Sequence, residues 1–163
     1  MTDTTQADDT VVRRSITVDA PIETAFAAFI ERFDEVKPHE HTLLATPIER
    51  TVFEPFVGGN IYDRAVDGSE CRWSRVLVYN LPSRVVFTWD IGPTWQLETD
   101  AALTSEVEVR WIAETAERTR VELEHRRLDQ HGPAWRNVRD GIDGGDGWPL
   151  YLTSYAAIFS RDE

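Results

Sequence analysis

The 163-residue sequence contains a single cysteine, Cys71. An intramolecular disulfide is therefore impossible, and so is a metal site built from several thiolates. Cys71 stands in an apolar run, where we expect a buried and chemically inert side chain. Long apolar runs are also lacking, because no stretch approaches the roughly 20 residues that a transmembrane helix needs. We therefore predict no membrane association.

The beginning of the sequence lacks the basic and apolar regions of a signal peptide. Its first ten residues, MTDTTQADDT, are polar and acidic and show no periodic pattern. We therefore predict a disordered tail over residues 1–11, one domain over residues 12–163, and a cytoplasmic location.

Positive charge is scarce, with 17 basic residues against 29 acidic ones and a formal net charge of -12. Such a chain is repelled by phosphate backbones and anionic surfaces, so we predict no nucleic-acid partner. The densest basic spots are Arg13-Arg14, Arg118 with Arg120, and Arg126-Arg127. Acidic residues stand near each of them, and we interpret these arginines as ion-pair partners on strands.

Strand-like runs joined by turn signals fill the middle of the chain. Between Val57 and Ile91, Asp67-Gly68 and Leu81-Pro82-Ser83 separate three such runs, which predicts an antiparallel meander. Two later runs alternate clearly between apolar and polar residues, which predicts two more strands with one buried face each. The residues on those two buried faces are Val107, Val109 and Trp111, then Val121, Leu123 and His125.

Helical patterns stand near both ends of the chain. Asp19-Ala20-Pro21 is a helix-start signal, and an apolar stripe follows it from Ile22 to Phe33. A second helix, with a strongly aromatic stripe, is predicted from Trp148 to Ser160. The segment Arg127–Gly147 is rich in glycine and aspartate, and we expect a mobile loop that can contain a helical turn around Trp135 to Val138. Strands grouped between terminal helices predict an α+β fold with an antiparallel sheet.

The order of these elements resembles the helix-grip fold of the START-like (SRPBCC) superfamily, and within it the AHSA-type domains, named after an activator of a heat-shock chaperone's ATPase. The resemblance covers about residues 12–160. Its motifs are Asp19-Ala20-Pro21, Phe56-Val57-Gly58-Gly59, Asp67-Gly68-Ser69-Glu70, Val85-Val86-Phe87-Thr88-Trp89 and Trp148-Pro149. The resemblance implies about seven strands wrapped around the C-terminal helix, with a cavity between them that takes small apolar ligands. The AHSA-type branch also implies a chaperone partner and a role in stress responses.

Aromatic residues supply the candidate ligand site. Either their rings fill the space between sheet and helix as a solid core, or they line a pocket to which a few groups add polarity. The predicted ligand-binding residues are Tyr62, Asp63, Trp73, Trp89, Trp111, His125, Trp148, Tyr151 and Tyr155. His125 is the leading polar candidate, because a buried imidazole needs a hydrogen-bond partner. It is either a core histidine bonded to a neighbour such as Tyr151 or Tyr155, or a general base near neutral pH.

Other groups of polar residues are weak indicators of a metal, cofactor or catalytic site. His39-Glu40-His41 has the spacing of a metal-ligand pair, but zinc needs further ligands in tetrahedral array, so we read a polar loop and predict neither metal nor cofactor. No nucleophile elbow or glycine-rich phosphate loop is present. We assign no catalytic residues.

Three functions remain open on these grounds. The first is binding of a small hydrophobic or amphipathic molecule in the cavity, gated by Arg127–Gly147, with no catalysis. The second is an enzyme of hydrolase or cyclase type that uses the same cavity, with His125 and an acid such as Asp63 as proton-transfer groups. The third is an interaction module whose partner is a chaperone or a second copy of the chain.

Overall fold

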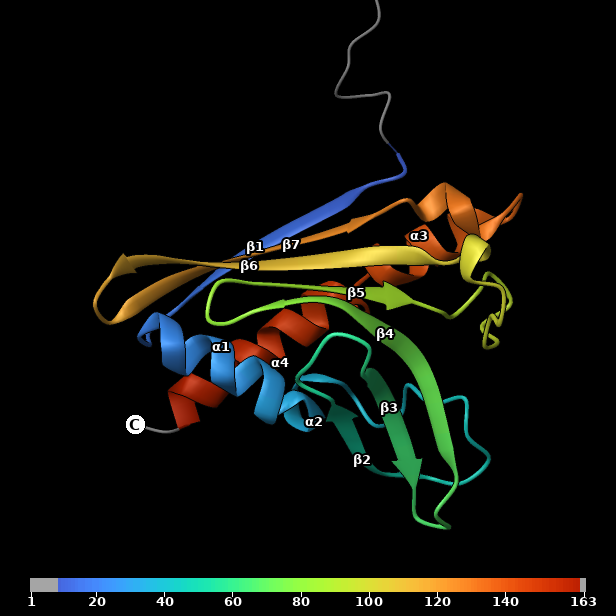
Figure 1. The fold of residues 1–163 in the computed structure, drawn as a ribbon, viewed down its shortest axis with the longest axis horizontal. Helices are drawn as coiled ribbons and strands as arrows, with labels where there is room; N and C mark the ends of the chain where they lie inside the picture. The colour runs from blue at the N-terminus through green and yellow to red at the C-terminus, as the bar shows by residue number, and fades with distance from the viewer. Residues whose placement is uncertain (1–8, 162–163) are drawn as a thin grey trace, which may run out of the picture.

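A seven-stranded antiparallel sheet dominates the computed structural model, which describes residues 9–161 (Figure 1). The strand order is β1-β7-β6-β5-β4-β3-β2, so the first strand pairs with the last and every other pair follows the sequence. The strands are β1 (Val12–Val18), β2 (Ile48–Phe53), β3 (Asn60–Ala65), β4 (Glu70–Asn80), β5 (Arg84–Trp89), β6 (Ser105–Thr115) and β7 (Arg118–Arg126). They curl around the C-terminal helix α4 (Trp148–Arg161). The predicted α+β helix-grip fold is confirmed.

The helical stripe predicted after the first strand is divided into two helices. Helix α1 (Ile22–Glu31) ends at Arg32, whose backbone N–H donates to the carbonyl of Ala28, and α2 (Phe33–Val36) follows directly. The apolar stripe continues across the break, because Phe33 is buried like the residues of α1 that precede it. Both helices therefore pack on the concave face of the sheet.

Alternation along β6 and β7 places their apolar residues on the concave face, as predicted. Val107 lies opposite His125, and Trp111 lies opposite Val121, in an unbroken register. All four of these side chains are almost fully buried. The period of two residues is enough to put them on one face, because successive side chains of a strand point to opposite sides.

The middle of α4 is part of a solid aromatic core. Trp111 Nε1 donates to the hydroxyl of Tyr155 at 3.1 Å, and that hydroxyl donates to the carbonyl of Ala25 at 2.5 Å. Phe26 and Phe29 pack edge to face on Trp111, with ring centroids 4.7 and 5.4 Å from it. This end of the space between helix and sheet is filled by side chains.

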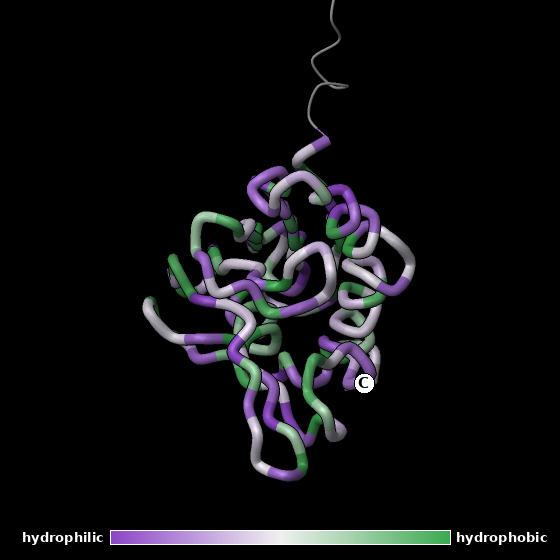
Figure 2. The backbone as a smooth tube through the Cα atoms, turned by 90° about the vertical axis from the view of Figure 1, so that its right-hand side faces the viewer, coloured by the Kyte–Doolittle hydropathy of each residue, from purple (hydrophilic) through white to green (hydrophobic). Residues whose placement is uncertain are grey.

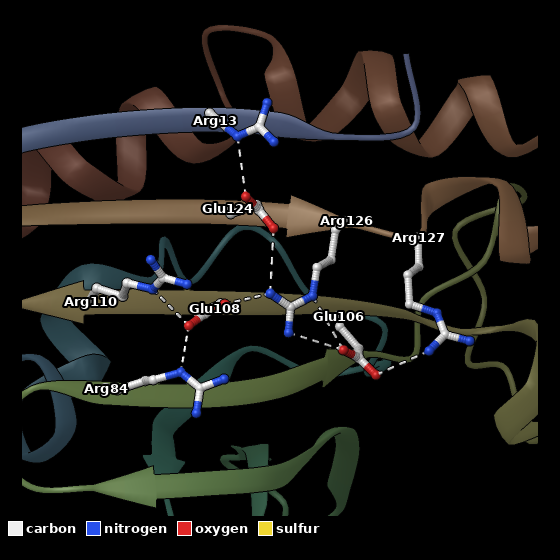
Figure 3. Close-up of polar contacts among 8 residues, drawn as sticks. All are labelled: Arg13, Arg84, Glu106, Glu108, Arg110, Glu124, Arg126 and Arg127. Atoms are coloured by element: carbon white, nitrogen blue, oxygen red, sulfur yellow. Dashed lines mark hydrogen bonds and ion pairs between the residues drawn. The ribbon is translucent and has the colours of Figure 1, made fainter. Parts of the chain in front are cut away.

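The convex face carries an ion-pair network centred on Glu108 (Figure 3). The carboxylate of Glu108 accepts from Arg84 at 2.5 Å, from Arg110 at 2.8 Å, and from Arg126. Burial alone would raise the pKa of Glu108, but these three guanidinium groups outweigh it and lower the pKa to about 2. The network joins β5, β6 and β7, and Arg13 extends it to β1 through Glu124. Arginines of the short basic runs are thus ion-pair partners, as predicted.

The expectation of a loop over Arg127–Gly147 is wrong for most of that segment. It contains the short 3-10 helix η2 (Leu128–His131) and the nine-residue helix α3 (Trp135–Asp143). Val138 and Ile142 are buried one turn apart and anchor α3 on the core. Glycines at 144, 145 and 147 are confined to the short link between α3 and α4. A second 3-10 helix, η1 (Ala101–Leu103), precedes β6.

Hydrophobic stretches along the backbone stay short and alternate with hydrophilic ones (Figure 2). Among residues 9–161, no helix has the length and apolar character that a bilayer crossing requires. The disordered tail predicted for residues 1–11 lies mostly outside the described residues.

Candidate functional site

A cavity of about 480 Å³ opens where the first turn of α4 meets the concave face of the sheet. Its walls come from β3, β4 and β5, from the segment after α2, and from the link between α3 and α4. The volume lies in the range of small-molecule sites. Five of the predicted site residues line this cavity, namely Asp63, Trp73, Trp89, Trp148 and Tyr151.

The other four predicted residues lie outside the lining. Trp111 and Tyr155 belong to the solid core described above. Tyr62 lies on the opposite face of β3 from Asp63, where the guanidinium of Arg72 stacks 4.3 Å from its ring centroid. His125 is fully buried behind the cavity wall.

His125 is held in a hydrogen-bond network that is closed at this residue, because both of its ring nitrogens are bonded. Trp148 Nε1 donates to His125 Nδ1 at 3.1 Å, and Ser105 Oγ lies 2.7 Å from both His125 Nε2 and His131 Nε2. An indole can only donate, so Nδ1 accepts and the neutral imidazole donates from Nε2 to Ser105, whose hydroxyl donates to His131. Both ring nitrogens of His125 are therefore occupied, and neither is free to take a proton from a ligand.

The electrostatics of His125 fit this structural role. Burial, aided by the nearby imidazole of His131, lowers the pKa of His125 to about 3. The ring is neutral at physiological pH and positions the Trp148 indole, which does line the cavity. The partners of His125 are Ser105 and Trp148, and not the predicted Tyr151 or Tyr155.

Indole rings form one continuous wall of the cavity. Trp89 packs edge to face on Trp73 and on Trp148, with centroids 5.3 and 5.5 Å apart. Tyr151 continues the row at 5.1 Å from Trp148. These rings come from β4, β5 and α4, so the wall exists only in the folded chain.

A buried ion pair supplies the polarity of the cavity. Lys37 Nζ lies 3.2 Å from Asp63 Oδ2, and each side chain is only 3% exposed. Thr51 Oγ1 donates to the other carboxylate oxygen of Asp63 at 2.8 Å. Burial lowers the pKa of the Lys37 ammonium, and the Asp63 carboxylate opposes that shift. The cavity thus joins an apolar wall to one charged donor whose counter-charge is held by β2 and β3.

Sequence reasoning missed Lys37, although one signal marks it. It is the only lysine in the chain, while every other cationic side chain is an arginine. The turn after α2 positions it, because its backbone N–H donates to the carbonyl of Phe33 while Val36 is buried beneath. An ammonium is more compact than a guanidinium, and Lys37 is buried beside Asp63.

The two loop histidines have separate partners. His39 Nε2 lies 2.7 Å from Asp34 Oδ1, whereas His41 Nδ1 lies 3.2 Å from the hydroxyl of Tyr151 at the cavity. Burial lowers the pKa of His41, and the Lys37 charge adds to the effect. Within residues 9–161, no group of three or more potential metal ligands is found.

The mouth of the cavity is formed by Trp95 and α3. Trp95 has a left-handed backbone (φ 59°), and a Cβ added to Gly141 would lie only 2.4 Å from its indole ring. Gly141 is therefore required for this close approach. Trp95 escaped prediction because nothing in its own short segment indicates a contact with residues far along the chain.

Together, the curled sheet, the gripped helix and the cavity between them define a START/SRPBCC-type helix-grip protein. Similar solved structures agree with this class. Txn09, an anthrahydroquino-gamma-pyrone synthase solved in complex with a ligand, is 35% identical, with a TM-score of 0.65 and coverage of 93% of this chain and 97% of that one. CalC from Micromonospora echinospora, a self-sacrificing resistance protein, is 30% identical, with a TM-score of 0.68 and coverage of 94% and 96%.

The chain therefore belongs to the helix-grip family that includes Txn09 and CalC. Protein MLL2253 from Mesorhizobium loti is 19% identical, with a TM-score of 0.65 over 94% of this chain and 98% of that one, and it shares the fold. No family model and no curated protein sequence matches the chain.

Proposed function

We propose that the protein binds a small, planar, mostly apolar aromatic molecule in the cavity at the first turn of α4. The observation that carries this proposal is the row of indoles that walls a space of about 480 Å³ beside a buried lysine–aspartate pair. The likeness to Txn09, a synthase of a fused aromatic product by its name, supports a ligand of this shape.

Binding can be tested by titrating the protein with a panel of tricyclic aromatic compounds and following heat release by calorimetry. A dissociation constant in the micromolar range or tighter, at one site per chain, supports the proposal. Gly145→Phe should abolish this binding, since Gly145 lines the cavity and a Cβ there meets no atom within 4 Å. Ile112→Phe, on the exposed side of β6, is the matched control and should bind normally. Equal binding by both variants would contradict the proposal.

A second candidate is a cyclase-type reaction in the same cavity. Lys37 and Asp63 favour it, because a charged donor and a carboxylate 3.2 Å apart can exchange a proton with a bound carbonyl compound. In this proposal they replace His125, whose two nitrogens are engaged elsewhere. Chromatography of each bound compound before and after incubation would reveal an isomeric product, and a binder recovered unchanged from every incubation would exclude this candidate.

The AHSA-type assignment, with a chaperone partner or a homodimer, stays a prediction. Sedimentation of the purified protein, alone and with a heat-shock chaperone ATPase, tests both partners at once. A species of about 18.7 kDa that neither self-associates nor co-sediments with the chaperone would exclude them.

A further inference from the structure

The ammonium of Lys37 has hydrogen-bonding capacity to spare. Of its three N–H groups, the protein offers acceptors to two, through Asp63 Oδ2 and the carbonyl of His41. No third oxygen acceptor for Nζ occurs among residues 9–161. Its other close neighbour is the ring of Trp73, with the centroid 6.0 Å from Nζ.

Two indole donors in the cavity wall are also unpaired. Trp73 Nε1 and Trp89 Nε1 are buried, and neither has a partner in the described part of the chain. Leaving a buried N–H unpaired is unfavourable, and an acceptor supplied by a ligand would remove that penalty. By contrast, the indole of Trp148 in the same wall is satisfied by His125.

The acceptors inside the cavity are already used. Both carboxylate oxygens of Asp63 are engaged, by Thr51 and by Lys37, and the hydroxyl of Tyr151 bonds His41. The remaining lining carboxylates, Glu40 and Asp146, are exposed at the mouth. The interior therefore has unpaired donors, whereas the acceptor oxygens of Asp63 and Tyr151 each already have a partner, and the complementary ligand should bring acceptors.

We propose that the ligand is an oxygenated aromatic, a ketone, quinone or phenolate, whose oxygen binds the Lys37 ammonium, with the indole N–H groups of Trp73 and Trp89 as further donors. This inference rests on the proposed function and adds the substrate class. Pure hydrocarbons and cationic aromatics are disfavoured, because the former leave the donors unpaired and the latter meet a fixed positive charge.

The test uses two probes of nearly equal shape, fluorene and 9-fluorenone, which differ by one carbonyl. Dissociation constants are measured by equilibrium dialysis for the full chain. A charge-assisted hydrogen bond predicts that 9-fluorenone binds about 10- to 100-fold more tightly than fluorene. Equal affinities would overturn the inference and leave the proposed function standing, whereas no binding of either probe would overturn both.

Variants assign the preference to its residues. Lys37→Met combined with Asp63→Asn removes the ammonium without leaving a buried charge, and it should reduce the preference for 9-fluorenone to the few-fold that the indole donors supply, while fluorene still binds. Trp89→Phe keeps an aromatic ring without the N–H and should reduce the preference a few-fold. Lys37→Arg, which retains a charged donor, is the matched control and should keep part of the preference for 9-fluorenone over fluorene. A preference that survives undiminished in the Lys37→Met/Asp63→Asn protein would overturn the role of Lys37.

Discussion

Two buried polar clusters lie next to the row of indoles, one bonded to Trp148 and the other beside Trp73, and they differ in how their central side chain is bonded. In the cluster of His125, Ser105 and His131, both ring nitrogens of His125 are bonded, and the chain of bonds from Trp148 ends at His131, whose Nδ1 has no partner among residues 9–161. In the cluster of Lys37 and Asp63, a charged donor has fewer partners than it can hold, and it borders a cavity. A closed network stabilises the fold, whereas an open one leaves capacity for a ligand. The predictions below separate these two roles.

The largest expected effect comes from breaking the closed network. His125→Ala leaves the Trp148 N–H unpaired and creates a void, which should lower the free energy of unfolding by about 3–5 kcal/mol. Urea denaturation measures it. His39→Ala is the matched control, because His39 is largely exposed and should change stability by less than about 1 kcal/mol. Similar losses of stability in the two variants would mean that the His125 network stabilises the fold no more than an exposed histidine does.

Acid should destabilise the protein through the same network. The pKa of His125 is about 3 in the folded state and near 6.5 when unfolded, so the unfolded chain binds the extra proton between these values. Stability should therefore fall as pH drops from about 6.5 towards 3, by a total on the order of 4 kcal/mol. His125→Gln should flatten this part of the pH profile.

Glu108 provides the comparison for that pH profile. Its pKa of about 2 lies below the usual 4.5, so its contribution is present above pH 4.5 and is lost between 4.5 and 2. Glu108→Gln should lower stability by a constant amount above pH 4.5 and flatten the slope of the profile only between pH 4.5 and 2. A slope above pH 4.5 that changes with Glu108 and ignores His125 would reverse the assignment.

The open cluster should show the opposite balance of stability and binding. Lys37→Met with Asp63→Asn removes a buried ion pair whose burial costs desolvation energy. The free energy of unfolding should therefore stay unchanged or rise by up to about 3 kcal/mol. Lys37→Met alone should destabilise, because the Asp63 charge remains buried without its partner. Thermal unfolding of the three proteins checks this order. If the double variant were the least stable, the pair would be structural.

The smallest expected effect concerns the mouth. Gly141→Ala pushes the Trp95 indole away from α3 and should speed ligand release a few-fold, with less than about 1 kcal/mol change in stability. Stopped-flow fluorescence measures the release rate. Gly145→Ala, which meets no atom within 4 Å, is the control. Equal rates in the two variants would mean that Trp95 does not limit exit.

Local patterns predicted the fold well, because alternation in β6 and β7 depends only on neighbouring residues. The same parity put His125 on the concave face correctly. Its partners Ser105 and Trp148 could not be read from this parity, since they come from β6 and α4 and meet only in three dimensions. Trp111 and Tyr155 show the same limit, because parity places a ring on the inner face but does not say whether it meets core or cavity.

Two features that were not predicted, helix α3 and the site residue Lys37, do leave a recognisable pattern in the sequence. Helix α3 was hidden by its glycines and aspartates, although Trp135, Val138 and Ile142 follow helical spacing. Lys37 stood in a segment without periodicity, yet it is the only lysine of the chain. Unusual residue choice therefore indicated the site more directly than the aromatic content did.

That single lysine also makes the central claim directly measurable. Protein labelled with ¹⁵N-lysine has one side-chain ammonium to observe by nuclear magnetic resonance. We predict a resonance protected from solvent exchange that shifts on addition of 9-fluorenone and stays in place on addition of fluorene. An ammonium signal that exchanges as freely as that of an exposed lysine, or that ignores both compounds while they bind, would contradict the account.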